Sequence, residues 1–117
     1  MKGLFLYTMT LNRVHDRFVV KEGNERMTLR VDSDPMVLVA RIRNANEKML
    51  EAKKEDATEE QRKRAAVLFA EAMFGKEQTE KLAAFYGGDY ACVMTISAMY
   101  FEKRLSGKIT KAQKKIK

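Results

Sequence analysis

Apolar and polar residues alternate over residues 26–32, and this is the first regular pattern along the chain. The apolar residues at every second position are Met27, Leu29 and Val31. A period of two is typical of a β-strand that buries one face. Residues 17–20 are equally rich in β-forming residues, and the Gly23-Asn24 pair between the two segments suits a tight turn. The two segments therefore predict a hairpin.

Residues 4–11 form a further segment rich in β-formers. We interpret this segment as a strand rather than a signal peptide, because it lacks a small-residue cleavage site and Thr8 and Thr10 interrupt its apolar run. Together with the hairpin it would complete a small meander over residues 4–32. One face of that meander is apolar, so we expect the helices that follow to pack against it.

From residue 35 onward the apolar positions recur every three or four residues, which is the period of an amphipathic helix. Asp34 and Pro35 suit the N-cap and the first position of a helix. Thr58 and Gln61 have the spacing of a capping box at the start of a second helix, which Gly75 is placed to end.

Two further helices follow in the pattern. A short helix spans residues 76–86, and a last helix begins near residue 89 and runs to about residue 106. Beyond Gly107 the apolar pattern continues weakly, so the sequence leaves open whether the last helix extends. We expect all the helices to share one core. Its predicted members are Leu38, Ile42, Leu68, Phe69, Leu82, Phe85, Val93 and Met94.

The stretch FYGGDY, residues 85–90, joins these last two helices and contains two adjacent glycines. A phosphate-binding loop places its glycines after a strand and before a helix, usually with Lys and Ser or Thr following. Here the glycines follow a predicted helix, and Asp89 would compete with an anion for the positive end of the next helix. We therefore interpret Gly87 as a helix-ending residue with positive φ and Asp89 as an N-cap.

These elements predict a mainly α, α+β fold, with a small N-terminal β hairpin or meander followed by three to four packed helices. A chain of 117 residues fits a single domain, which we place at residues 1–107. The net charge of +7 is unevenly distributed: residues 102–117 contain seven basic residues and one acidic residue, which leaves +1 for all the others. We interpret residues 108–117 as a basic C-terminal arm outside the domain.

The sequence contains no catalytic constellation. Cys92 is the only cysteine and His15 the only histidine, which is too few for a disulfide or a conventional zinc site. We interpret Cys92 as a small core residue and His15 as a surface residue. We predict that the protein is not an enzyme and has no catalytic residues, metal or cofactor. Apolar runs such as residues 36–40 are far shorter than the roughly 20 residues of a membrane span, so we expect a cytoplasmic protein without a membrane partner.

The features that stand out are those of a binding protein. Eight methionines suit adaptable surfaces as well as irregular cores. Two adjacent aromatic residues near the basic segment cannot both face the core, so one of them can contact protein or nucleic acid. The predicted partner-binding residues are Tyr100, Phe101, Lys103, Arg104, Lys108, Lys111, Lys114, Lys115 and Lys117.

Residues 65–117 resemble the C-terminal part of the tail assembly chaperones of long-tailed phages and Firmicutes prophages. The shared elements are a helix ending in FG, the short helix KEQTEKLAAFY, the GGD corner and a final helix running into ITKAQKK. Upstream, ERMTLRVDSDPMVLVARI is similar to the short β segment and helix at the N-terminal side of these chaperones. The resemblance covers residues 25–117.

This resemblance implies a non-enzymatic protein of virion morphogenesis in the bacterial host cytoplasm. Such chaperones bind the tape measure protein, keep it soluble, and are displaced as subunits of the tail tube protein polymerise around it. Two alternatives remain open: a small nucleic-acid-binding protein that uses the basic arm, and a structural tail or head completion protein. The nearly neutral body disfavours the first. The sequence also leaves the oligomeric state open, including a homo-oligomer.

Overall fold

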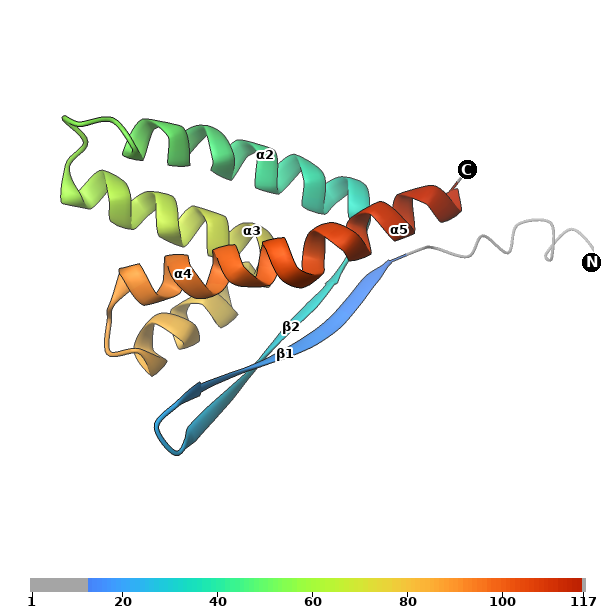
Figure 1. Cartoon of the computed structure of the whole chain (residues 1–117), viewed down its shortest axis with the longest axis horizontal. Coiled ribbons are helices and arrows are strands. Elements are labelled where there is room, and N and C mark those ends of the chain that lie inside the picture. The colour runs from blue at the N-terminus through green and yellow to red at the C-terminus, as the bar shows by residue number, and fades with distance from the viewer. Residues whose placement is uncertain (1–12, 117) are drawn as a thin grey trace, which may run out of the picture.

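A two-stranded hairpin followed by a group of packed helices forms the fold (Figure 1). The computed structural model describes the backbone of residues 13–116 and the side chains of residues 13–51 and 53–111. In chain order the elements are β1 (Val14–Glu22), β2 (Glu25–Ser33), α2 (Pro35–Ala52), α3 (Glu59–Phe85), α4 (Tyr90–Tyr100), the π-helical turn η1 (Phe101–Leu105) and α5 (Ser106–Ile116). The predicted mainly α, α+β class is confirmed. The strand predicted at residues 4–11 lies outside the described residues.

The hairpin pairs β1 with β2 in antiparallel register, with Phe18 opposite Leu29. Its turn consists of Gly23 and Asn24, and of these two only Gly23 has positive φ, at 60°. A positive φ at the first turn residue alone is the pattern of a type II′ turn, whose twist matches that of the flanking strands. The predicted alternation in β2 is confirmed, since Leu29 and Val31 are buried, whereas Thr28, Arg30 and Asp32 are exposed.

Helices α2 and α3 lie side by side and run in opposite directions (Figure 1). Asp34 caps α2, because its Oδ1 accepts a hydrogen bond from the Met36 N–H at 2.7 Å. The capping box of α3 is complete: the Gln61 N–H donates to Thr58 Oγ1 at 3.1 Å, and the Thr58 N–H donates to Gln61 Oε1 at 2.8 Å. Both predicted helix starts are therefore confirmed.

Gly75 interrupts α3 with φ of 84° and ψ of 166°, a conformation outside the helical region. The chain changes direction at this residue, so the rest of α3 runs as a separate short helix (Figure 1). The Thr79 hydroxyl donates to the Gly75 carbonyl at 2.8 Å, one turn further along the chain. The predicted end of the second helix at Gly75 is confirmed as a kink.

The glycine pair between α3 and α4 is a helix-ending corner, as predicted. Gly87 and Gly88 have φ of 66° and 82°. The Gly88 N–H donates to the Ala83 carbonyl at 2.7 Å and the Gly87 N–H donates to the Ala84 carbonyl at 3.0 Å, which together form a Schellman motif. The next helix begins immediately afterwards, because Asp89 Oδ1 accepts from the Ala91 N–H at 3.0 Å.

The last helix continues well past residue 107, through α4, η1 and α5 in succession (Figure 1). Its buried positions are Val93, Ser97, Tyr100, Leu105 and Ile109. The step of five residues from Tyr100 to Leu105 falls in η1, and a π-helical turn accommodates that step because its hydrogen bonds join residues five apart.

The predicted domain boundary at residue 107 falls inside this continuous helix. Ile109 is only 5% exposed and belongs to the hydrophobic core, and α5 packs against α2 and β1. The charge density of the basic segment suggested an arm in solvent, whereas the buried side chains of Leu105 and Ile109 decide where this helix lies. The predicted arm is the end of a packed helix, at least as far as Ile109.

The core lies between the hairpin and the helices. Of the eight residues predicted to share it, five are buried: Leu38, Ile42, Phe69, Leu82 and Val93. The other three, Leu68, Phe85 and Met94, are partly buried and pack against its edge. The apolar inner face of the hairpin packs against the helices, with Val14, Val20, Leu29 and Val31 in the same hydrophobic cluster. The helix faces assigned from the sequence are correct.

Replacing Gly87 with Ala should lower the free energy of unfolding by about 1–2 kcal/mol, because a residue with a Cβ resists positive φ. A Cβ built at this position meets no atom within 4 Å, so the cost comes from the backbone conformation alone. Gly107 provides the matched control. It also has open space around its Cβ position, but it lies in α5 without positive φ. Gly107→Ala should stabilise the protein by about 0.5–1 kcal/mol. Urea unfolding of both variants measures the difference, and equal effects of the two substitutions would contradict the corner assignment.

Candidate functional site

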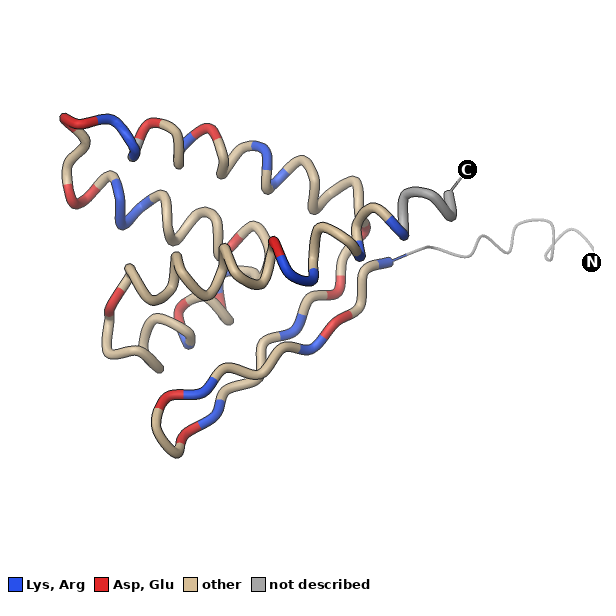
Figure 2. Tube along the Cα trace, in the orientation of Figure 1, with Lys and Arg blue, Asp and Glu red and all other residues tan. Residues whose placement is uncertain are grey.

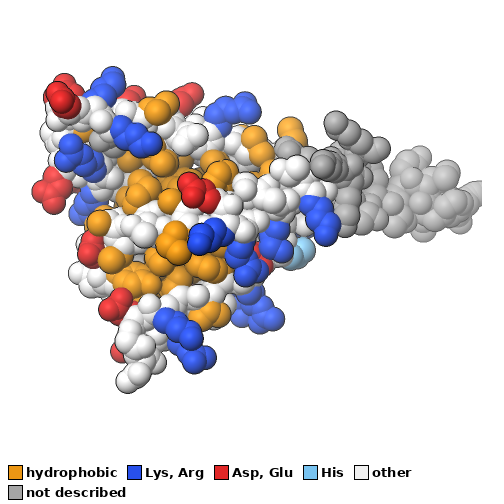
Figure 3. Space-filling model, in the orientation of Figure 1, with side chains coloured by type: hydrophobic (Ala, Val, Ile, Leu, Met, Phe, Trp, Pro, Cys, Tyr) orange, Lys and Arg blue, Asp and Glu red, His pale blue; other side chains and the backbone are white. Residues whose placement is uncertain are grey.

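An apolar groove runs between three helices on one face of the molecule. Helix α3 contacts both α2 and α4, whereas α2 meets the last helix principally through α5. The two outer helices therefore diverge away from α5 and leave α3 as the floor between them (Figure 1). Hydrophobic side chains gather over this space in the space-filling view (Figure 3). The groove has a volume of about 830 Å³.

Small and flexible side chains line the groove. They are Ala65 and Ala66 from α3, Ala91, Met94 and Ala98 from α4, and Met49 from α2. Alanines on two facing helices let the backbone of a third helix approach closely, toward the shorter end of the usual helix spacing of about 8–10 Å. Methionines adapt to different apolar shapes. This lining suits an incoming helix better than a small polar ligand, which would need several convergent polar groups.

The rim of the groove carries charges of both signs. Basic residues and Glu59 stand at the α2 and α3 side, whereas Asp89 and Glu102 stand at the α4 side. Lys63 lies over the ring of Tyr90, with its Nζ 4.7 Å from the ring centroid, in a cation–π contact that joins α3 to the start of α4. The rim thus fits a partner with mixed charges.

A second polar cluster joins the hairpin to the last helix, and Asp16 on β1 is its centre. The Asp16 carboxylate, only 6% exposed, accepts hydrogen bonds from the Tyr100 hydroxyl at 2.9 Å and from Arg104 at 2.6 and 3.0 Å. Lys108 adds a longer ion pair at 3.8 Å. We call these four residues the Asp16 network. The network ties β1 to the last helix at three successive turns.

The network changes the ionisation of its members. Burial alone would raise the pKa of Asp16, but the hydrogen bonds from Arg104 and Tyr100 and the positive charges of Lys108 and Arg104 outweigh it, so the pKa lies below its ordinary value. Burial and the neighbouring carboxylate raise the pKa of Tyr100. Asp16 is therefore ionised and Tyr100 neutral at physiological pH, which keeps all the bonds of the network in place.

Two of the predicted partner-binding residues, Tyr100 and Arg104, belong to the Asp16 network. Tyr100 is 1% exposed and packs against Phe18 and Phe74, with ring centroids 4.9 and 5.5 Å away. Arg104, whose side chain is 45% exposed, is engaged by Asp16. Tyr100 and Arg104 thus have a structural role, because a buried carboxylate requires hydrogen-bond donors and these two residues supply them.

The remaining predicted residues have different surroundings. Phe101 packs edge-on against Phe69, with the two ring centroids 6.1 Å apart. Phe101 is half-buried, so it is the member of the adjacent aromatic pair that keeps some exposed surface. Lys103 and Lys111 are exposed, and Lys108 leans toward Asp16. The side chains of Lys114, Lys115 and Lys117 lie outside the described part of the chain.

Cys92 is half-buried and is not a core residue as predicted, whereas His15 lies at the surface. The Cys92 thiol donates a hydrogen bond to Asp89 Oδ2 at 3.4 Å, and this bond, burial and the negative charge of Asp89 raise the pKa of the thiol. The helix N-terminus therefore does not activate Cys92 as a nucleophile. His15 is exposed on the hairpin, with its Nδ1 3.5 Å from Asp32 Oδ1. Among the described residues no group of three or more His, Cys, Asp or Glu side chains could hold a metal ion.

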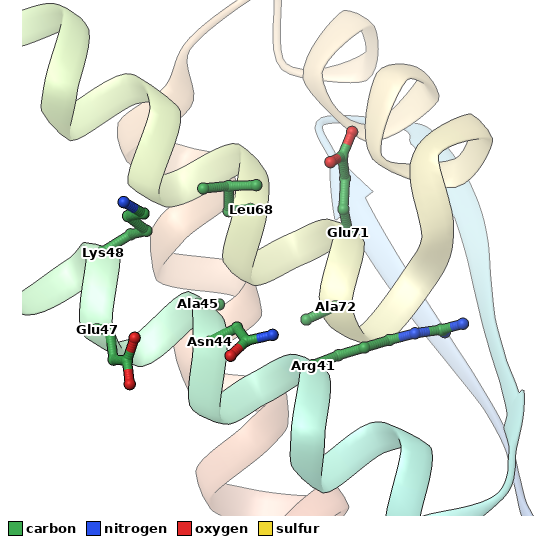
Figure 4. Close-up of a pocket in the computed structure, with 8 residues that line it drawn as sticks. All are labelled: Arg41, Asn44, Ala45, Glu47, Lys48, Leu68, Glu71 and Ala72. Atoms are coloured by element: carbon green, nitrogen blue, oxygen red, sulfur yellow. The ribbon is translucent and has the colours of Figure 1, made fainter.

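A shallower hollow of about 530 Å³ lies between α2 and α3 (Figure 4). Its centre is formed by Ala45, Leu68 and Ala72, and charged side chains such as Arg41 and Glu71 extend away from that centre (Figure 4). Because these polar groups diverge, the hollow offers no set of groups that could bind one ligand together.

Comparisons of the chain with known protein families, with curated proteins and with solved structures find no match. The resemblance to tail assembly chaperones therefore remains a hypothesis. Over the described residues, none of the helices combines the length and the apolar character that crossing a membrane requires.

Asp16→Asn should lower the free energy of unfolding at pH 7 by about 1–2 kcal/mol, because the charge-assisted bonds to the partly exposed Arg104 weaken. The folded pKa of Asp16 is depressed, so this stabilisation is present above the unfolded value of about 3.9 and is lost as the pH falls through the lower folded value. The difference between wild type and Asp16→Asn should therefore shrink below about pH 4. Denaturant unfolding at several pH values measures this difference, with Asp56→Asn at the exposed corner after α2 as the control for a lost charge. A gap that stays constant down to pH 3 would contradict the network.

Proposed function

We propose that the protein is a non-enzymatic tail assembly chaperone that holds a helical segment of a tape measure protein in the groove between α2, α3 and α4. The observation that carries the proposal is the groove itself, an open apolar channel floored by alanines and bordered by charges of both signs. The resemblance of residues 25–117 to chaperones of this class is its second support.

The chemistry of the groove suits such a client. A helix laid into a groove is held by apolar anchors that recur every three or four residues. Met49 and Met94 can adjust to anchors of different shape, as a chaperone with a long client requires. Such adaptable contacts are also weak enough individually for the tail tube protein to displace the chaperone as it polymerises around the tape measure. The proposed setting is the cytoplasm of the bacterial host.

A structural tail or head completion protein could use the same groove. The two proposals differ in the fate of the protein, because a chaperone is absent from the finished particle and a completion protein stays in it. Detection of the chain in purified virions would favour the structural alternative.

Blocking the groove should weaken capture of the tape measure protein. Ala91→Arg and Ala98→Arg each place a long side chain across the α4 wall of the groove. Co-expression with helical segments of the tape measure protein from the same genome, followed by co-purification, measures binding. We expect a complex with wild type and at least about tenfold weaker binding for both variants, which corresponds to a reduction of about 1.4 kcal/mol in binding free energy.

Ala84→Arg is the matched control, because Ala84 is exposed on α3 and does not line the groove. This variant should bind like wild type, and circular dichroism should show that all three variants remain folded. The proposal fails if wild type forms no complex with any segment, or if the groove variants bind as tightly as Ala84→Arg.

A further inference from the structure

The outer face of the hairpin, which points away from the hydrophobic core, is strongly basic. Side chains alternate between the two faces of a strand, so one face receives every second residue of β1 and β2. The residues on the outer face are His15, Arg17, Val19 and Lys21 from β1 and Arg26, Thr28, Arg30 and Asp32 from β2, and all are exposed. Lys and Arg residues of the two strands lie opposite each other along the ribbon (Figure 2).

Cations face cations directly across the two strands. Arg17 pairs with Arg30, and Lys21 pairs with Arg26. Residues directly opposite in a sheet have Cβ atoms about 5 Å apart, and like charges at this distance destabilise the sheet. Within the described residues none of these four side chains forms an ion pair. The fold thus retains four unneutralised cations at a cost in stability.

The acidic residues of the hairpin do not neutralise this face. Asp32 is the only one on the outer side, and its Oδ1 already accepts from Arg13 at 2.8 Å. Asp16 lies on the inner side within the Asp16 network, and Glu22 and Glu25 share the inner parity at the tip of the ribbon. We call Arg17, Lys21, Arg26 and Arg30 the basic ribbon.

Besides the packing of the hairpin's inner face, side chains at the end of α3 hold the ribbon through hydrogen bonds to its main chain. The Gln78 side chain accepts from the Arg30 N–H and donates to the Arg30 carbonyl, both at 2.7 Å. The Tyr86 hydroxyl donates to the Lys21 carbonyl at 3.3 Å. These bonds use the main chain of Arg30 and Lys21 and leave their charged side chains available. The basic ribbon is therefore preorganised for binding, which reduces the entropy that binding costs.

We propose that the basic ribbon binds the phosphate backbone of duplex DNA, as an activity separate from the helix-binding groove. Charge complementarity carries this assignment, since a duplex presents one negative charge per about 1.7 Å of axis. A two-stranded ribbon also fits the major groove, which is about 12 Å wide. An acidic protein partner is less suited to this face, because Val19 is its only apolar side chain and protein interfaces depend on buried apolar or aromatic anchors.

Fluorescence anisotropy with a short labelled duplex of random sequence, titrated at several salt concentrations, tests this proposal. Wild type should bind at low salt and weaken steeply as salt rises. Arg17→Gln/Arg30→Gln should bind at least about tenfold more weakly at moderate salt, and the slope of log affinity against log salt should fall by about 1.8, or about 0.9 for each phosphate that is no longer neutralised. The thermal stability of this variant should be unchanged or slightly higher, because it removes a like-charge pair.

Arg41→Gln/Arg43→Gln is the matched control, because it removes the same charge from exposed positions on α2. This control should keep the affinity and salt slope of wild type. Equal losses in the two double variants would show that only net charge matters and would overturn the proposal. It is also overturned if wild type does not bind the duplex at low salt, or if polyglutamate competes as well as unlabelled duplex. Since the groove variants Ala91→Arg and Ala98→Arg leave the ribbon intact, they should still bind DNA, so failure of the chaperone proposal would not affect this result.

Discussion

A single buried carboxylate, Asp16, fixes the relation between the two halves of this fold. The hairpin and the last helix are far apart in the chain, and Asp16 joins them by hydrogen bonds from Tyr100 and Arg104. A carboxylate that is removed from water without donors is costly, so the hairpin can pack on the helices only where the last helix supplies those donors. Since α5 also contacts α2, the position of the last helix then determines how far α4 and α2 diverge. The groove is thus a consequence of the Asp16 network and the packing around it.

The distribution of charge follows from the same arrangement. Arg104 and Lys108, which look in the sequence like part of a solvated basic segment, turn toward Asp16. The four cations of the basic ribbon lie on the outer face of the hairpin, on the opposite side of the strands from the packed helices. The apolar groove and the basic ribbon are formed by different elements. A helical protein client and a nucleic acid could therefore occupy the molecule at the same time if both proposals hold.

Local features of the fold could be predicted because neighbouring residues determine them. The caps at Asp34 and Thr58 and the turn at Gly23 each depend on contacts within about four residues, so their sequence signals are direct. The Asp16 network was not predictable in this way, since its partners lie 84 and 88 residues away and no spacing rule connects them. The groove has a weak signal in the alanines of α3 and α4, but the sequence does not show that α2 and α4 diverge and that Ala91 and Ala98 on α4 keep exposed surface.

The length of the last helix was only partly predictable from the sequence. The step of five residues from Tyr100 to Leu105 is visible in the sequence, but it signals a π-helical turn only once both residues are known to be buried. Without that turn, Ile109 would fall off the apolar face and the basic segment would have little to pack against. The alternating cations of the basic ribbon were also visible, but the overall charge balance of the first 101 residues concealed them. Their segregation to one face appears only when the strand pairing is known.

Native-state hydrogen exchange of the backbone amides tests most directly whether the last helix is part of the fold. Amide protons within a stable packed helix exchange only through opening reactions that cost free energy, whereas those of a solvated arm exchange at the rate of an unfolded peptide. We predict that the amides of residues 105–110 are protected to an extent comparable with those of β1 and α3. Exchange of residues 105–110 at unfolded-peptide rates, alongside protected amides in α2 and α3, would contradict the account.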